Sequence, residues 1–253
     1  MRSAQRQSPI EEEGVLIRTA AAFAAITSLF GLAFVACGGG GSQDATPTQV
    51  LKIVTRSPSP SPGEADLTGF AFPLAGGCLP SGDQLMPGSP RDYRQGVHEG
   101  VDFYDSDNCT SIGVGTPVLA AKAGTVIRAD WDYTPLTQEI LDELQNATPV
   151  DGQTDEHALD LYRGRQVWID HGNGVVTRYA HLSGIADGIT VGVSVSQGQL
   201  IAYVGNTGTP ESVTDPNAEM HLHFEIRVGD VYLGKGMSPS DVRSLYEKAL
   251  GIK

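Results

Sequence analysis

Residues 219–226, near the C-terminal end of the chain, read Glu-Met-His-Leu-His-Phe-Glu-Ile. In a β-strand, side chains alternate between two faces, so His221 and His223 share one face while Leu222 and Phe224 share the other. The apolar face is typical of a sheet packed on a core. Two adjacent imidazoles on the opposite face indicate a metal site, although paired histidines also occur on strand surfaces without a ligand.

Two upstream segments strengthen the case for a metal site. Residues 98–102 read His-Glu-Gly-Val-Asp, and residues 179–182 read Tyr-Ala-His-Leu. Hydrolysis at a single zinc ion needs three protein ligands and an open fourth position for water, whose pKa the metal lowers to about 7. The imidazoles of His98 and His223 and the carboxylate of Asp102 can provide those three ligands.

A zinc hydrolase also needs a base for the water proton and a group that steadies the oxyanion. His181 and His221 are free for these roles, and His221 is the better placed base because it neighbours a ligand on the same strand. The segment beginning at His98 also resembles a degraded His-Glu-X-X-His helix with Glu99 as base. The glycine at position 100 and the following Val-Asp-Phe-Tyr run favour an extended segment instead.

The remaining two histidines have simpler interpretations. His171 precedes the Gly-Asn-Gly sequence of residues 172–174 and is interpreted as a turn residue, whereas His157 is expected to be exposed. No Gly-X-Ser-X-Gly elbow, phosphate loop or dinucleotide fingerprint occurs in the sequence.

The frequency of turn-forming residues in the chain predicts a mainly β fold. With 31 glycines and 15 prolines among 253 residues, the chain has many turn signals. The glycines and asparagine at 172–174 supply the positive φ angles of a tight hairpin. Short strands are expected at 70–74, 116–120, 124–128, 166–170, 175–179, 189–195, 200–204, 221–227 and 231–233.

Three further segments differ from this pattern of strands. Residues 132–161 are acidic and partly helical in pattern, and are interpreted as an insertion between neighbouring strands. Residues 209–219 form a long polar loop directly before the two histidines, where specificity tends to lie. Residues 238–253 predict a C-terminal helix packed on the domain, with Ser238 as cap, Pro239 at the first position and Asp241 completing a capping box.

The charge balance and the N-terminus predict where the protein works. The formal charge is −13 and persists without residues 1–37, which hold three Arg and three Glu, leaving 14 basic against 27 acidic residues. This balance argues against nucleic acid as a partner.

Residues 19–36 are apolar and precede Cys37, so we interpret residues 1–37 as a secretory signal. It resembles the signal of bacterial lipoproteins, in which the cysteine, here Cys37, is lipidated. A transmembrane anchor is the alternative interpretation.

A predicted tether and a predicted disulfide are consistent with a location outside the cytoplasm. Residues 38–64 are rich in Gly, Ser, Thr and Pro and are predicted to be a disordered tether, averaging about 30 Å from end to end. With Cys37 lipidated, Cys78 and Cys109 remain as an even pair, which predicts a disulfide in an oxidising compartment. A cysteine-containing metal site is the less favoured reading because better ligands lie nearby.

In their order, the motifs resemble the lysostaphin/LytM-type zinc endopeptidases of peptidase family M23. The motifs are the His98 and Asp102 segment, Gly-Thr-Pro-Val at 115–118, Tyr-Ala-His-Leu at 179–182, Gly-Asn-Thr-Gly at 205–208 and His-Leu-His-Phe-Glu at 221–225. The resemblance implies His98, Asp102 and His223 as ligands of one Zn²⁺ and His181 and His221 as the catalytic pair, with exchangeable roles. It covers roughly residues 70–231.

The resemblance also implies a fold and a substrate. The expected fold is a compact antiparallel β-sheet of the barrel-sandwich hybrid type over residues 65–237, followed by the C-terminal helix. The expected activity is hydrolysis of peptidoglycan cross-bridges or stem peptides by a monomer outside the cytoplasm, attached to the membrane only through lipid and open to a regulatory protein partner. Alternatives are a non-hydrolytic scaffold or activator of other wall hydrolases, and an enzyme acting on glycine-rich proteins.

Overall fold

The computed structural model describes residues 63–105, 107–147 and 154–252. The predicted signal, the lipidated Cys37 and nearly all of the predicted tether lie outside these residues. Among the described residues, no helix has both the length and the hydropathy needed to cross a membrane.

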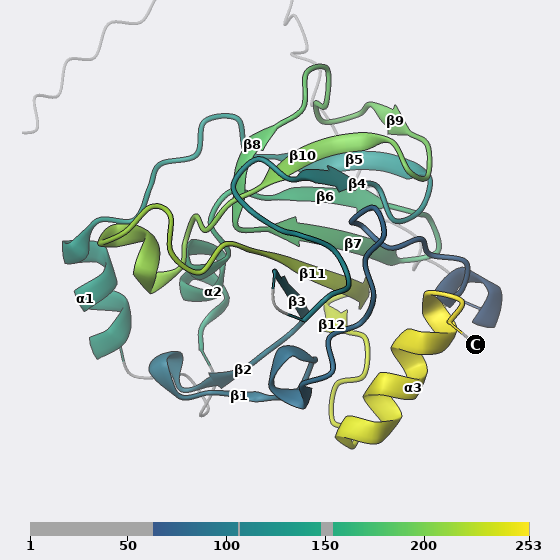
Figure 1. The fold of residues 1–253 in the computed structure, drawn as a ribbon, viewed down its shortest axis with the longest axis horizontal. Coiled ribbons are helices and arrows are strands. Elements are labelled where there is room, and N and C mark those ends of the chain that lie inside the picture. The colour runs from purple at the N-terminus through teal and green to yellow at the C-terminus, as the bar shows by residue number, and fades with distance from the viewer. Residues whose placement is uncertain (1–62, 106, 148–153, 253) are drawn as a thin grey trace, which may run out of the picture. The chain divides into compact units, whose positions relative to one another are not determined.

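The described part of the chain is mainly β (Figure 1). Its strands are β1 (Pro90–Arg91), β2 (Gly96–Val97), β3 (Val101–Tyr104), β4 (Pro117–Leu119), β5 (Gly124–Ala129), β6 (Val167–Asp170), β7 (Val175–Ala180), β8 (Leu182–Ile185), β9 (Ser194–Val195), β10 (Leu200–Val204), β11 (His221–Val228) and β12 (Val231–Tyr232). Its α-helices are α1 (Gln138–Asn146), α2 (Glu156–Arg163) and α3 (Pro239–Ala249). Its 3₁₀ helices are η1 (Glu64–Leu67), η2 (Asp83–Leu85), η3 (Asp92–Arg94) and η4 (Pro210–Val213).

All strand pairs are antiparallel, as the sequence predicts. The large sheet has the order β12-β11-β7-β6-β5-β9, with β3 also paired to β11. A second sheet has the order β4-β10-β8, and β1 pairs with β2. The apolar side chains of both larger sheets pack into one core, which includes Val118 and Ile201 from the second sheet and Val126 and Ile169 from the first.

Strand β11 is buried on both faces, and its two faces differ in chemistry. Leu222, Phe224 and Ile226 are fully buried and belong to the core. The alternate positions from His221 to Arg227 are also buried but polar, so hydrogen bonds and ion pairs must compensate them. The alternation that the sequence predicts therefore separates an apolar core face from a polar face that carries both histidines.

Two predicted strands are wrong in whole or in part. Residues 70–74 form no strand, although Phe70 and Leu74 are buried in the core. Their backbone makes single hydrogen bonds to separate partners, and Pro73 has no N–H to donate to a ladder. Of residues 189–195, only β9 is a strand, because the preceding residues turn through Gly192, whose φ is +91°.

The segment interpreted as an insertion contains two helices in the described part of the chain. Helices α1 and α2 lie in the connection between β5 and β6, and these two strands pair directly with each other. Thr137 caps α1 through its side chain, and Asp155 caps α2. Figure 1 shows both helices on the side of the strands opposite to α3.

The C-terminal helix and the disulfide are also confirmed. The Ser238 hydroxyl accepts a hydrogen bond from the Asp241 N–H at 3.3 Å, and Pro239 is the first residue of α3. The helix packs Val242 and Tyr246 into the core. Cys78 and Cys109 form a disulfide that joins the segment before β1 to the loop after β3.

Candidate metal centre

The site is built on β11 by the strands that flank it. In the pairing of β3 with β11, Asp102 lies opposite His223 and Tyr104 lies opposite His221. Strand β7 pairs with β11 as well and ends one residue before His181. The register of three strands thus brings five polar side chains to one end of the large sheet.

His98 enters from the loop between β2 and β3. Its backbone N–H donates to the Ser89 carbonyl at 2.8 Å, and its carbonyl accepts from the Gly88 N–H at 2.8 Å. These bonds hold the loop so that His98 Nε2 lies 2.9 Å from Asp102 Oδ1 and 3.1 Å from His223 Nδ1. His223 Nδ1 lies 2.8 Å from the same Asp102 oxygen, so the three atoms form a tight triangle.

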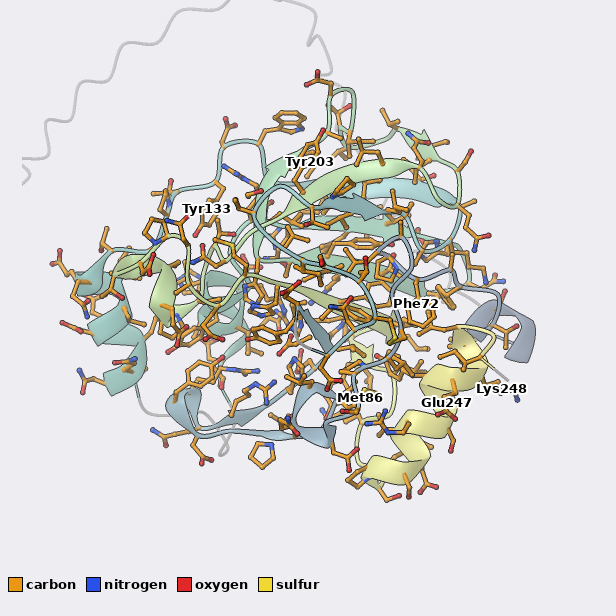
Figure 2. All side chains as sticks on the ribbon, viewed as in Figure 1. Phe72, Met86, Tyr133, Tyr203, Glu247 and Lys248 are labelled. Atoms are coloured by element: carbon orange, nitrogen blue, oxygen red, sulfur yellow. A yellow bond between two sulfur atoms is a disulfide. The ribbon has the colours of Figure 1, made fainter. Side chains whose placement is uncertain are left out.

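Hydrogen-bond partners decide which ring nitrogens carry protons. His98 Nδ1 lies 3.2 Å from the backbone carbonyl oxygen of Met86, the residue that is labelled in Figure 2. A carbonyl oxygen can only accept, so this nitrogen is the donor. Both nitrogens of His223 face a carboxylate oxygen, with Nε2 3.1 Å from Glu225 Oε1 and Nδ1 2.8 Å from Asp102 Oδ1. In the tautomer that is protonated at Nε2, the ring donates to Glu225. In these neutral forms, both rings turn a lone pair, at His98 Nε2 and His223 Nδ1, toward Asp102.

This donor set fits a zinc ion. Three electron-pair donors that meet without a proton between them repel one another unless a cation binds them. Two imidazole nitrogens and one carboxylate oxygen are ligand atoms that zinc takes, and each ring has the outer hydrogen bond typical of a metal-bound histidine. The three potential ligand atoms lie within 4.8 Å of one another, and all three residues are buried.

Arg91 binds one carboxylate oxygen of Asp102, so that only the other oxygen is directed at the rings of His98 and His223. Its Nη2 donates to Asp102 Oδ2 at 3.0 Å. Burial alone would raise the pKa of Asp102, but its interactions with His98 and His223 lower it well below its usual range. Asp102 is therefore an ionised carboxylate whose Oδ1 is directed at the rings of His98 and His223.

His181 and His221 form a second pair beside the triangle. Their ring centroids are 4.5 Å apart, and the His181 centroid is 5.6 Å from that of His223. His181 Nδ1 donates to the Thr207 carbonyl at 2.8 Å, and His221 Nδ1 donates to the Glu219 carbonyl at 2.7 Å. Each ring therefore keeps Nε2 as its proton acceptor.

The ring of His221 is further held by stacking. The Tyr104 ring lies against it with a centroid distance of 4.4 Å and an interplanar angle of 14°. His221 Nε2 lies 3.8 Å from Asp102 Oδ1, which is too long for a hydrogen bond. Stacking and the Glu219 carbonyl thus orient His221 without using the nitrogen that faces the site.

Burial keeps most of these histidines neutral at pH 7. It lowers the pKa of His98 to about 4, against the attraction of Asp102. Burial also lowers the pKa of His221, and it lowers the pKa of His181 well below the usual range, where charge on His221 would add repulsion. Only His223 has a raised pKa, because its bonds to Asp102 and Glu225 outweigh its burial.

Backbone strain is present at His181. Its φ is +60°, the left-handed region that a residue with a side chain rarely adopts. Its N–H donates to the Arg163 carbonyl at 2.9 Å, and its ring is held by Thr207. The surrounding hydrogen bonds thus hold a conformation that aims this imidazole at His221 and His223.

All five site histidine and aspartate residues line one cavity of about 490 Å³. One wall comes from the insertion, with Gln145 of α1 and Leu159 and Tyr162 of α2. Another comes from the polar loop before β11, with Pro210 and Glu211. The two segments that depart from the strand pattern therefore both shape the space in front of the triangle.

The structure brings the five predicted site residues together and separates the other histidines from them. His171 bonds to Ala123 and Thr177, as expected for a turn residue, and His157 is exposed. The degraded-helix alternative is wrong, because β3 is extended and Glu99 pairs with Arg163 and Arg227.

Sequence reasoning missed three residues that contact the site. Glu225 shares the polar face of β11 with His221 and His223, so the two-residue alternation could have identified it. Arg91 and Tyr104 carry no local signal, because only the fold of β1 and β3 brings them to the histidines.

Several known proteins are similar in sequence to this chain. The model of "Peptidase family M23" matches residues 96–235. The chain is 33% identical over 139 residues to the peptidoglycan DD-endopeptidase ShyA of Vibrio cholerae, which is 55% of this chain and 22% of ShyA. It is 34% identical over 82 residues to ShyC of the same organism, which is 32% of this chain and 17% of ShyC. The chain spans about a fifth of the length of these relatives.

Two solved structures are similar to the chain at low sequence identity. A zinc-containing peptidase from Vibrio cholerae is 22% identical, with a TM-score of 0.38 and coverage of 65% of this chain and 38% of that one. The catalytic domain of lysostaphin from Staphylococcus simulans is 21% identical, with a TM-score of 0.36 and coverage of 70% and 90%.

Proposed function

Because the chain belongs to peptidase family M23, we propose that residues 65–237 form a zinc endopeptidase that hydrolyses peptide bonds in peptidoglycan cross-bridges or stem peptides. The observation that carries the proposal is the meeting of three lone pairs, from His98, Asp102 and His223, in the lining of a cavity of about 490 Å³. Similarity to two peptidoglycan DD-endopeptidases supports the substrate class.

The metal would be held by His98 Nε2, Asp102 Oδ1 and His223 Nδ1. Bound there, zinc supplies a Lewis acid for the scissile carbonyl and a water of lowered pKa. Arg91 and Glu225 keep the ligands in place by taking the second oxygen of Asp102 and the second nitrogen of His223. The remaining chemistry, which is proton transfer and oxyanion stabilisation, falls to side chains of the protein.

His221 is the general base in this proposal, and its Nε2 takes the proton of the attacking water. The stacked Tyr104 ring and the Glu219 carbonyl hold the imidazole for that transfer. The proton taken by His221 passes to the amine nitrogen when the C–N bond breaks. His181 orients or stabilises the oxyanion, and it can donate from Nε2 only in its protonated, cationic form. Since both rings present an accepting Nε2, the two roles are exchangeable on this geometry.

The attachment of the domain is a separate proposal. We propose that residues 1–37 are a lipoprotein signal, that Cys37 carries the lipid, and that residues 38–64 tether the enzyme outside the cytoplasm, facing the cell wall. The apolar run before Cys37 and the Gly/Ser/Thr/Pro composition after it support this arrangement. Radiolabelled palmitate should enter the wild-type protein in a bacterial host but not the Cys37→Ser variant.

Mass spectrometry of digested peptidoglycan tests the activity. Purified protein is incubated with isolated sacculi, with and without a zinc chelator, and the released fragments are identified. Chelator-sensitive release of peptides with new amino termini is expected, and the fragments identify the bond that is cut. Oligoglycine as a second substrate tests the alternative of an enzyme for glycine-rich proteins.

Two outcomes would contradict the proposal. Cleavage of oligoglycine without release from sacculi would assign the protein to glycine-rich substrates. Tight zinc binding without cleavage of any substrate, together with stimulation of a separate wall amidase, would assign it to the non-hydrolytic activators.

A further inference from the structure

Arg163, the last residue of helix α2, contacts three glutamates through its guanidinium group. Its Nε lies 2.8 Å from Glu225 Oε1, its Nη1 lies 2.9 Å from Glu156 Oε1, and its Nη2 lies 2.5 Å from Glu99 Oε2. The Arg163 side chain is 5% exposed. Because each nitrogen serves a different carboxylate, the position of this one side chain is fixed in all directions.

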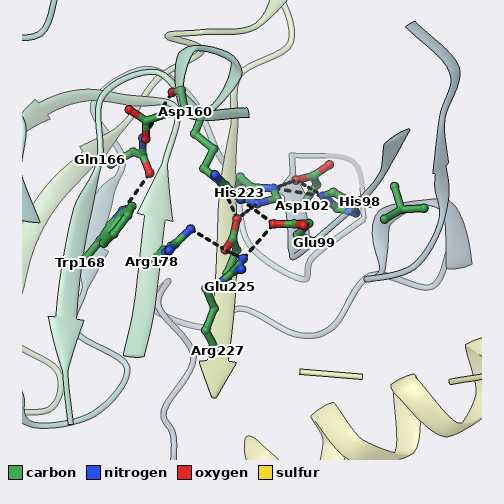
Figure 3. A network of polar contacts seen from close by, with 12 residues as sticks. His98, Glu99, Asp102, Asp160, Gln166, Trp168, Arg178, His223, Glu225 and Arg227 are labelled. Carbon is green, nitrogen blue, oxygen red and sulfur yellow. Dashed lines mark hydrogen bonds and ion pairs between the residues drawn. The ribbon is translucent and has the colours of Figure 1, made fainter. Parts of the chain in front are cut away.

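Glu225 connects this arginine to the metal centre. Its Oε1 accepts from both Arg163 Nε and His223 Nε2, and its Oε2 accepts from Arg227 Nη1 at 2.8 Å. Figure 3 shows Glu225 between His223, Arg178 and Arg227. The Glu225 side chain is completely buried, so its carboxylate is stable only with cations and donors on both oxygens.

Arg163 also contacts the catalytic pair through its backbone. Its carbonyl accepts the N–H of His181, the residue with the strained φ. The next residue, Gly164, has a φ of +65° and packs on Thr207, whose carbonyl accepts the His181 Nδ1–H. The end of α2 is therefore bonded to His181 on one side and, through Glu225, to His223 on the other.

Helix α2 belongs to the segment inserted between β5 and β6, which could be only a wall of the cavity. The contacts of Arg163 with Glu225 and His181 show that helix α2 also supports the metal centre. We propose that Arg163 is a positioning residue that fixes Glu225, and through it His223, so that the insertion is a structural part of the metal site. This inference rests on the proposed function only in taking His223 as a zinc ligand.

The physical reason lies in the geometry of the guanidinium group. A partner on the far nitrogen of a metal-bound histidine sets the tautomer and the ring orientation, and its loss typically costs 10–100-fold in metal affinity. Without Arg163, the Glu225 oxygen that orients His223 loses its cation. Lysine at this position would keep the charge but could not reach three carboxylates, because its single nitrogen lacks the planar fork.

The test is the zinc affinity of the full chain, measured by competition with a chromophoric chelator. Arg163→Gln is expected to weaken zinc binding by about 10–100-fold, and Arg163→Lys by a smaller factor. Cobalt substitution gives an independent readout, because the visible spectrum of bound Co²⁺ changes when a ligand is misplaced. Circular dichroism at the same temperature establishes that each variant is folded.

Arg128 of β5 provides a matched control, because it contacts helix α2 through Asp160 and not through Glu225. Its guanidinium contacts Asp160 of α2, with Nη1–Oδ1 at 2.5 Å and Nη2–Oδ2 at 3.1 Å, and it also contacts Asp130. None of its ion pairs among the described residues involves Glu225. Arg128→Gln therefore weakens the attachment of α2 without changing the contacts of Arg163 and His223 with Glu225. A zinc affinity within about twofold of wild type is expected.

Each result decides the inference. Equal zinc affinity and equal Co²⁺ spectra in wild type and folded Arg163→Gln would overturn it, as would an equal loss in Arg128→Gln. If Arg163→Gln does not fold, Arg163→Lys decides by the same comparison. A wild-type protein that binds no zinc would overturn the proposed function, and this inference with it; normal wild-type binding with unaffected Arg163 variants would overturn this inference alone.

Discussion

The imidazole rings of His181 and His221 lie 4.5 Å apart, although 40 positions separate the two residues in the chain. His181 follows β7 and His221 begins β11, and the antiparallel pairing of these strands produces the contact. Each ring uses Nδ1 on a backbone carbonyl, so the pair presents two accepting nitrogens beside the proposed zinc ligands.

The first prediction separates metal binding from turnover. Asp102→Ala and His223→Ala should lose zinc, because each removes one of three proposed ligand atoms. His181→Ala should keep zinc and lose turnover by about 10²–10⁴-fold, the usual contribution of a positioned acid or base. Zinc content by atomic absorption and hydrolysis rates check both; full activity in the His181 variant would remove its assignment.

The second prediction concerns Gly100, which lies between the two ligands of the His98 segment. A Cβ here would come within 2.5 Å of the Phe224 carbonyl oxygen and 2.9 Å of the His223 ring. Gly100→Ala should therefore cost about 1–3 kcal/mol of unfolding free energy and weaken zinc binding, because the His223 ring must move. Denaturant unfolding and zinc titration measure the two effects.

Gly113 is the control for that substitution. A Cβ at Gly113 meets nothing within 4 Å, and no positive φ restricts the residue. Gly113→Ala should change the unfolding free energy by no more than about 0.5 kcal/mol. Similar losses in both variants would mean that close packing against His223 is not the cause.

The third prediction concerns the pH dependence of metal-free stability. Burial lowers the pKa of His98 to about 4, whereas an unfolded histidine titrates near about 6.5. As the pH falls, the unfolded chain therefore binds this proton before the folded protein does. The stability that neutral His98 contributes is present above about pH 6.5 and is lost as the pH falls toward 4. The difference corresponds to about 3 kcal/mol.

The comparison with His98→Asn isolates that contribution. Urea unfolding of chelator-treated wild type and variant at several pH values should give a stability difference that shifts against wild type on acidification. An unchanged difference between pH 7 and pH 4 would show that His98 is not held neutral in the folded protein.

The fourth prediction concerns the disulfide. Cys78 and Cys109 are 31 positions apart, and a loop of this size predicts a stabilisation of about 3–4 kcal/mol from chain entropy. The double Cys→Ser variant should unfold at a lower denaturant concentration but still bind zinc, because neither sulfur contacts the triangle. A loss of zinc in the folded double variant would instead tie the disulfide to the position of Asp102.

Local properties of the sequence predicted β11 well. Alternation along residues 221–226 depends only on the two-residue period of a strand, and it correctly separated the histidines from Leu222 and Phe224. The same reasoning failed at residues 70–74, because apolar side chains can be buried without a partner strand. Burial can be anticipated from residue type, whereas strand pairing depends on distant segments.

The sequence alone determined the residue types of the site, the β class of the fold, the position of the insertion and the pair of cysteines. Only the tertiary structure decided that Asp102 lies opposite His223, that Tyr104 stacks on His221, and that Arg163 bonds to Glu225 from 62 positions away. The physical reason is that alternation, capping and turns act between near neighbours, whereas strand register and buried charge pairing exist only once distant segments are packed together.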